Sequence, residues 1–164
     1  MGMYTDIQLT VLLSKSTNKE IIDLIRSPLA HAGWDNWCGD EFSARESIRF
    51  PDHPLFKYSR VLFLLGEGGA DEFNNRADDP FLSLTRGEGG HWRLSLLNSI
   101  KNYNDEIELL LDWLTPYVCS ESGKVGEKRY EEFNTPTDIL FIDGAFSFKA
   151  QPEEDDGAWG FSCH

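Results

Sequence analysis

The chain has 164 residues, and its 15 Lys and Arg against 28 Asp and Glu give a formal net charge of −13 at pH 7. Apolar residues make up 40% and aromatic residues 13% of the chain. This composition is enough for one domain with a sizeable core, and it excludes a chain that is disordered throughout. Direct binding of nucleic acid is disfavoured, because contacts to phosphate groups require a basic surface.

The sequence predicts that the protein is located in the cytoplasm. Its first residues show no basic stretch followed by an apolar run, so no secretion signal is expected. Apolar runs such as residues 61–65 are far shorter than the ~20 residues of a membrane-spanning helix. Cys38, Cys119 and Cys163 are odd in number and widely spaced, which favours free thiols in a reducing compartment over a disulfide framework.

The first elements predicted are a strand and a helix. Ile7, Leu9, Val11 and Leu13 alternate with Gln8, Thr10 and Leu12, the period of a strand with one buried face. Residues 17–20, Thr-Asn-Lys-Glu, have the form of a capping box, and apolar residues then follow at helical spacing. We therefore expect a helix that begins near Asn18. Because Pro28 cannot donate a backbone hydrogen bond, the helix should end or bend near Arg26.

The middle of the chain is less regular. Residues 34–60 predict a long connection anchored by aromatic side chains, with a short strand over residues 47–50 as one possibility. The continuous apolar run at 61–65 predicts a central strand covered on both faces. Residues 66–80, rich in Gly, Asn and Asp, predict an exposed loop. Alternation over residues 92–96 indicates another strand.

The second half predicts a helix and two further strands. Ile107, Leu110, Leu111 and Leu114 share one helical face, and the preceding acids suit the positive end of a helix. Residues 128–133 and 139–148 predict strands joined by a turn at 134–137.

The predicted fold class is α+β, a two-layer sandwich over residues 1–150. A ferredoxin-like arrangement with one added strand and both helices on one sheet face is preferred, and a different split of the same layers is the alternative. Residues 151–164 predict a mobile acidic tail.

Motifs for nucleotides or metals are incomplete. Gly-Glu-Gly-Gly occurs at residues 66–69 and again at 87–90, but neither copy has the Lys and Ser/Thr pair of a phosphate-binding loop, so turns are favoured. The loop acids Asp71, Glu72, Asp78 and Asp79 lack the spacing of a regular calcium loop. No cofactor and no metal site is predicted.

No catalytic residue is predicted either. Cys38 or Ser95 with His53 or His91 are the candidates for a nucleophile and its base, but no recognisable motif surrounds them. The adjacent carboxylates Glu131 and Glu132 would point to opposite faces of a strand.

One stretch resembles known proteins. The sequence Gly-Gly-His-Trp-Arg-Leu-Ser-Leu at residues 89–96, with Lys-Asn-Tyr at 101–103 and Leu-Asp-Trp-Leu-Thr-Pro-Tyr at 111–117, resembles segments of small phage and prophage proteins. The resemblance implies a mobile-element setting, in which small acidic proteins block host defence complexes. It assigns no functional residue.

The function predicted is that of a non-enzymatic inhibitor or binding protein. Its acidic surface would dock on a basic, nucleic-acid-binding protein, such as an anti-phage defence effector in an anti-CRISPR or anti-restriction role. The partner-binding residues predicted are Asp71, Glu72, Asp78, Asp79, Asp105, Glu106, Glu108, Asp112, Glu131, Glu132, Glu153, Glu154, Asp155, Asp156 and Trp159.

Other functions fit the same residues. The acids could serve solubility and the start of a helix alone. An immunity protein for a basic nuclease toxin needs the same charge complementarity. An enzyme or small-ligand protein could use the two Gly-rich loops, with or without a metal, and a phage accessory protein could simply self-associate.

Overall fold

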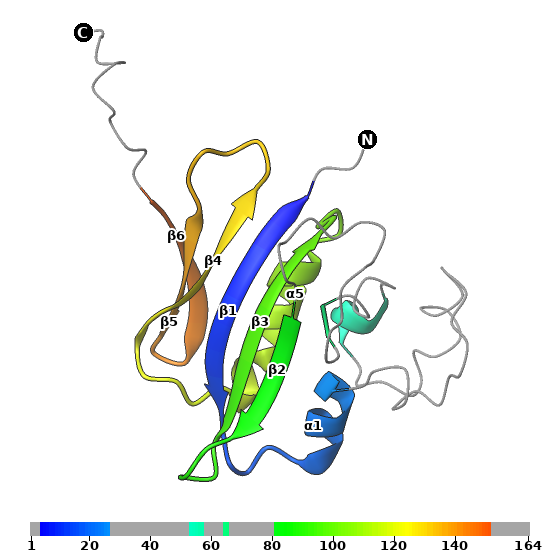
Figure 1. Ribbon diagram of the computed structural model, residues 1–164, viewed down its shortest axis with the longest axis vertical. Helices are drawn as coiled ribbons and strands as arrows, with labels where there is room; N and C mark the ends of the chain where they lie inside the picture. Colours follow the sequence, from blue (N-terminus) through cyan, green and yellow to red (C-terminus); the bar gives the residue numbers. More distant parts are fainter. Residues whose placement is uncertain (1–3, 27–52, 58–63, 66–80, 152–164) are drawn as a thin grey trace, which may run out of the picture.

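The computed structural model of the protein describes residues 4–26, 53–57, 64–65 and 81–151. Within these ranges the chain forms a six-stranded antiparallel sheet and two α-helices, so the predicted α+β class is confirmed (Figure 1). The strands are β1 (Thr5–Leu13), β2 (Phe81–Arg86), β3 (Trp92–Ile100), β4 (Gly123–Tyr130), β5 (Thr137–Ile142) and β6 (Ala145–Ala150). The helices are α1 (Lys19–Arg26), α5 (Glu106–Leu114) and the short 3-10 turns η2 (Pro54–Lys57) and η3 (Thr115–Tyr117).

Strand β1 lies inside the sheet, whose order is β2-β3-β1-β4-β5-β6. One edge of β1 pairs with β3 along its full length, and its first five residues pair with β4 on the other edge. Its alternate side chains Ile7, Leu9, Val11 and Leu13 are all buried. The strand predicted over residues 7–13 is confirmed, and it begins two residues earlier.

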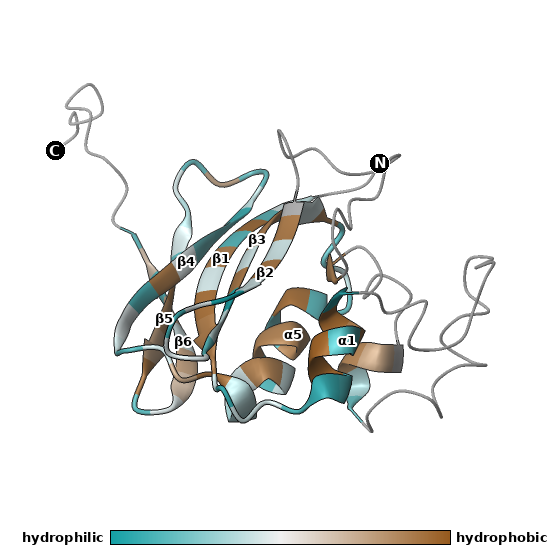
Figure 2. Ribbon diagram, turned by 60° about the horizontal axis from the view of Figure 1, so that its bottom comes forward, coloured by the Kyte–Doolittle hydropathy of each residue, from teal (hydrophilic) through white to brown (hydrophobic). Residues whose placement is uncertain are grey.

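Both helices cover the same face of the sheet (Figure 2). Helix α1 buries Ile21, Ile22, Leu24 and Ile25, and α5 buries a longer stripe that includes Ile107, Leu110, Leu111 and Leu114. These residues join the buried side chains of β1 and β3 in one hydrophobic core. Both predicted helices are confirmed, because in each the apolar residues recur at helical spacing.

The start of α1 differs from the predicted capping box. The side-chain oxygen Oδ1 of Asn18 accepts the N–H of Ile21 at 3.0 Å, so Asn18 caps the helix in place of Thr17. The Oγ1 atom of Thr17 is buried and has no hydrogen-bond partner among the described residues. The cap therefore falls one residue later than the motif predicted.

Two strand predictions were wrong in extent. The strand predicted over residues 128–133 is β4, which runs from Gly123 to Tyr130 and so begins and ends earlier than predicted. The single strand predicted over residues 139–148 is two strands, β5 and β6, joined at Asp143 and Gly144. Both of these residues have positive φ, 53° and 79°, as a type I′ hairpin turn requires. Strand β2 was not predicted at all.

The central strand predicted at residues 61–65 is wrong for Leu64 and Leu65, the two residues of this run that the structure describes. Leu64 and Leu65 are buried in the core, but neither belongs to the sheet, and the backbone of Leu64 is helical. A short apolar run fits a buried helical segment as well as a buried strand. The predicted short strand at 47–50, the loop at 66–80 and the tail from residue 152 onward lie outside the described residues.

Two further expectations concern the thiols and the membrane. The thiol of Cys119 is free, as predicted, and it is exposed. Cys38 and Cys163 lie outside the described residues. Neither helix of the described part has the length and apolar character needed to span a membrane.

Gly126 allows β4 to approach β1 closely. The register between β4 and β5 shifts between Lys124 and Gly126, which marks an irregularity of the bulge type. A Cβ atom at Gly126 would lie 2.0 Å from the backbone oxygen of Gln8 and 2.9 Å from the Cα of Leu9. Because these are backbone atoms of the central strand, no side-chain rotation can relieve the clash.

We expect Gly126→Ala to lower the free energy of unfolding by about 1–3 kcal/mol, since the added methyl group forces the two strands apart. Gly87→Ala is the matched control, because a Cβ there meets its nearest atom, the His91 oxygen, at an ordinary 3.7 Å. Urea unfolding of both variants measures the difference. An equal loss of stability in the two variants would contradict this account of the β1 and β4 pairing.

Candidate functional site

The acids predicted on α5 do not form a single outward-facing surface. Glu106 is fully buried, and its Oε1 accepts the backbone N–H of Asn104 at 2.7 Å, just before the helix. The prediction that Glu106 contacts a partner therefore does not fit its position. Its acidity serves the start of the helix, where backbone N–H groups attract negative charge.

Glu108 is held by groups of the protein itself. Its carboxylate accepts hydrogen bonds from the Nζ of Lys128 on β4 and from the Nδ2 of Asn102, the latter at 2.8 Å. Burial alone would raise the pKa of Glu108, but the bonds from Lys128 and Asn102 outweigh it and hold the pKa below the ordinary value of 4.5. The pair links α5 to the sheet, and Lys128 neutralises a carboxylate that was predicted to face a partner.

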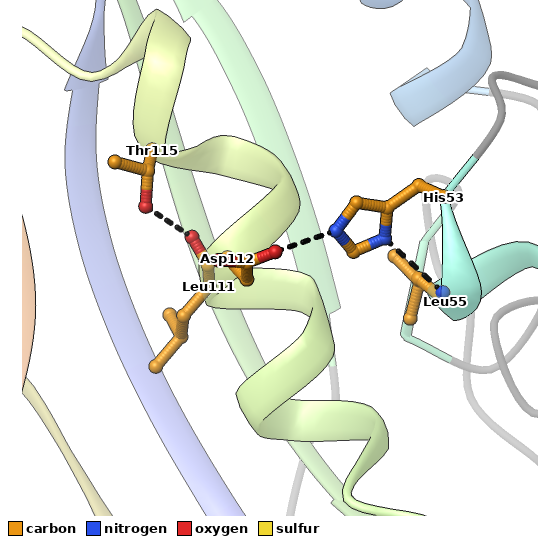
Figure 3. Close-up of polar contacts among 5 residues, drawn as sticks. All are labelled: His53, Leu55, Leu111, Asp112 and Thr115. Atoms are coloured by element: carbon orange, nitrogen blue, oxygen red, sulfur yellow. Dashed lines mark hydrogen bonds and ion pairs between the residues drawn. The ribbon is translucent and has the colours of Figure 1, made fainter.

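Asp112 takes part in a connection between α5 and η2 (Figure 3). The Nε2 of His53 lies 2.7 Å from the Oδ2 of Asp112, and the backbone N–H of Leu55 donates to the Nδ1 of His53 at 3.1 Å. Since Nδ1 accepts a hydrogen bond, Nε2 carries the proton that is donated to Asp112. Both ring nitrogens of His53 are therefore engaged.

The same contact brings an aromatic side chain into the core. Phe56 of η2 is buried, and its ring meets that of Trp113 edge to face, with centroids 5.1 Å apart. The hydrogen bond between His53 and Asp112 thus fixes η2 against α5 across 59 residues of sequence. The acidic side chain remains largely exposed, at 74%, so the interaction is screened by solvent.

The three other predicted acids of the described part lie at the end of β4 and before the start of α5. The Oε1 of Glu131 accepts the backbone N–H of Tyr4 at 2.9 Å, which closes the pairing of β1 with β4. Glu132 is exposed in the turn that follows β4, and Asp105 is exposed before α5 with a positive φ of 58°. Asp105, Asp112 and Glu132 are therefore the predicted acids of the described part that present a carboxylate to solvent.

The remaining predicted partner residues lie outside the described residues. They are Asp71, Glu72, Asp78, Asp79, Glu153, Glu154, Asp155, Asp156 and Trp159.

The acid surplus is unevenly divided along the chain. The described residues hold 11 of the 15 Lys and Arg and 14 of the 28 Asp and Glu, a formal charge of −3. The other segments hold 4 basic and 14 acidic residues, a formal charge of −10. Most of the net negative charge therefore belongs to residues outside the described ranges.

The residues considered for nucleophilic catalysis are not brought together where they are described. Ser95 lies on β3, and its Oγ is 3.3 Å from the Oγ1 of Thr10 on β1. Both side chains belong to the face opposite the helices, because the neighbouring Leu94, Leu96 and Val11 point into the core. His53 lies on the helix side, and Cys38 lies outside the described residues.

The sheet face opposite the helices carries a pocket of about 410 Å³. Asp6, Gln8, Leu97 and Arg129 line part of it, and the Nη2 of Arg129 lies 3.3 Å from the Oδ2 of Asp6. The charges of this pair balance each other. No cluster of three or more potential metal-ligating side chains occurs in the described ranges.

Another pocket, of about 350 Å³, gathers basic side chains that the sequence analysis did not single out. Lys15, Lys19, Arg26 and Arg86 line it. They come from the connection before α1, from α1 itself and from β2, so no local pattern groups them. The run Ser-Lys-Ser-Thr-Asn-Lys at residues 14–19 is the available signal, since it places two cations and several hydroxyls at a helix start.

Comparison with known proteins adds no family to this description. No protein-family model, no curated protein and no solved structure matches the chain.

We expect a double-mutant cycle of His53→Ala and Asp112→Ala to give a coupling free energy of about 0.5–1 kcal/mol. This coupling free energy is typical of a hydrogen bond to a charged group that is partly exposed to solvent. Urea unfolding of the two single variants, the double variant and the unchanged protein measures it. Strict additivity of the two single effects would contradict the connection and would leave Asp112 free for another role.

Proposed function

We propose that the protein is a non-enzymatic binding protein that docks on a basic, nucleic-acid-binding protein in the cytoplasm. The observation that carries the proposal is the division of charge. The described residues have a formal charge of −3, whereas the residues outside the described ranges have −10. Because those segments carry the excess, the proposed contacts come mainly from residues 66–80 and 152–164.

Charge complementarity gives this proposal a physical mechanism. A negative segment attracts a basic partner over several ångströms and speeds the encounter, and the effect falls as salt rises. Charges at the rim of an interface act chiefly on the association rate and on specificity. The resemblance of residues 89–117 to phage and prophage proteins favours a host defence effector as the partner, in an anti-CRISPR or anti-restriction role.

The described acids play a smaller part in this proposal. Glu106 and Glu108 are engaged within the protein, and Asp112 holds His53. The sheet and helices would then act as the frame that presents the acidic segments.

We also propose that the frame contains a ferredoxin-like unit. Its support is the element order β1, α1, β2, β3, α5, β4 together with the sheet order β2-β3-β1-β4. Strands β5 and β6 extend the sheet beyond β4, so the unit carries two added strands where one was expected.

The test is capture of a partner from host lysate at low salt, followed by affinity measurements with the purified partner at two salt concentrations. We expect the variant in which Asp71, Glu72, Asp78 and Asp79 become amides to bind on the order of tenfold more weakly, with a smaller salt dependence. A variant of the acids at 153–156 should behave in the same way.

The matched control removes four exposed carboxylates from the described part, namely Glu20, Glu88, Glu121 and Asp143, and so changes the net charge equally. The proposal predicts a smaller loss for this control. Equal affinity and equal salt dependence for all variants would overturn it. A nuclease toxin as the captured partner would replace the anti-defence role with that of an immunity protein.

A further inference from the structure

The pocket beside α1 collects positively charged side chains that no described carboxylate neutralises. Four of its lining residues, Lys15, Lys19, Arg26 and Arg86, are cationic, and Asp23 is the acid that lines it with them. Among the described residues, no carboxylate forms an ion pair with any of the four cations. In a chain with a net charge of −13, many carboxylates are available to pair with cations. Four unpaired cations in one pocket are therefore unusual.

The two arginines of the pocket are held in place by one aromatic ring. The guanidinium carbon of Arg26 lies 5.1 Å from the centroid of Trp92, and that of Arg86 lies 5.3 Å from it. Arg26 donates to the backbone oxygen of Leu84 at 3.1 Å, and Arg86 donates to that of Gly90 at 3.4 Å. A guanidinium has five N–H donors, so each arginine is positioned with donors to spare.

Thr17 adds a hydroxyl group that lacks a partner. Its Oγ1 atom is buried and makes no hydrogen bond in the described part of the chain, and the residue lines the same pocket. Leaving a buried hydroxyl unpaired costs free energy. A ligand oxygen in the pocket would accept its proton, and the adjacent start of α1 also favours negative charge.

The size and lining of the pocket indicate more than a single inorganic ion. A volume of about 350 Å³ lies at the lower end of the range for small-molecule sites, roughly 300–1,000 Å³. The side chains of Ile22 and Trp92 provide apolar surface next to the cations. Paired arginines and lysines are the groups that recognise phosphate oxygens.

We propose that this pocket binds a small organic phosphate, with the cations and the Thr17 hydroxyl on the phosphate group and the organic part against Ile22 and Trp92. The inference is independent of the proposed docking of a basic partner, because none of these residues belongs to the acidic segments.

The test is isothermal titration calorimetry of the full chain with AMP, glucose 6-phosphate, inorganic phosphate, and the unphosphorylated adenosine and glucose. We expect at least one organic phosphate to bind with a dissociation constant below about 1 mM, more tightly than inorganic phosphate and than its unphosphorylated counterpart. Binding of no organic phosphate would overturn the proposal. If inorganic phosphate binds as tightly as the organic phosphates, the proposed contact of the organic part with Ile22 and Trp92 would be overturned.

Variants locate the site. Lys15 and Arg86, which are both exposed, changed together to Gln should weaken binding at least tenfold. The control Lys149→Gln removes one exposed cation on β6 and should leave the affinity unchanged. Thr17→Val should weaken binding several-fold while the melting temperature of the free protein stays equal or rises. Equal weakening by Lys149→Gln, or unchanged affinity in the pocket variants, would contradict the assignment.

Discussion

The alternating strand β1 is the constraint on which the rest of the structure depends. Hydrogen bonds to β3 and β4 fix its two edges, and Ile7, Leu9, Val11 and Leu13 fix one face against the helices. Each such buried side chain contributes roughly 1.5–3 kcal/mol. A shift of β1 by one residue would turn these four side chains to the opposite face, so the register of the neighbouring strands follows from it. The close approach of β4 at Gly126 is a direct result of that arrangement.

The acid surplus and the unpaired cations of the basic pocket belong to different residues of the chain, and this division links the two proposals. Around β1 and the helices, carboxylates such as Glu106 and Glu108 are used to start α5 and to attach it to the sheet. Most of the acid surplus belongs to segments outside the described residues. The pocket beside α1 instead collects cations that no described carboxylate pairs with. A chain of this kind can attract a basic protein through one set of residues and an organic phosphate through another, because solution charge interactions are screened within about 8–10 Å.

Local periodicity in the sequence predicted the helices and strands whose pattern is set by neighbouring residues. It did not predict the features that are set by contacts between residues far apart in the sequence. The patterns of β1, α1 and α5 are long enough to show both period and buried face, and these elements were predicted. The turn at Asp143 and Gly144 has a local signal, an Asp-Gly pair. The prediction of a single strand over residues 139–148 did not use this signal. The run at 61–65 fitted two kinds of structure. For the candidate site, the contact of His53 with Asp112 spans 59 residues, and the basic pocket draws on three separate segments, so neither is visible in a local pattern. Acidity alone also could not distinguish the buried Glu106 from the exposed Asp105.

Native-state hydrogen exchange of the full chain tests the central role of β1 most directly. If the account is right, the amides that β1 shares with β3 and β4 exchange only through global unfolding and show the highest free energies of opening. The amides of β6, at the edge of the sheet, should open at lower free energy. Exchange of the β1 amides as fast as those of β6 would contradict the claim that the fold is organised around this strand.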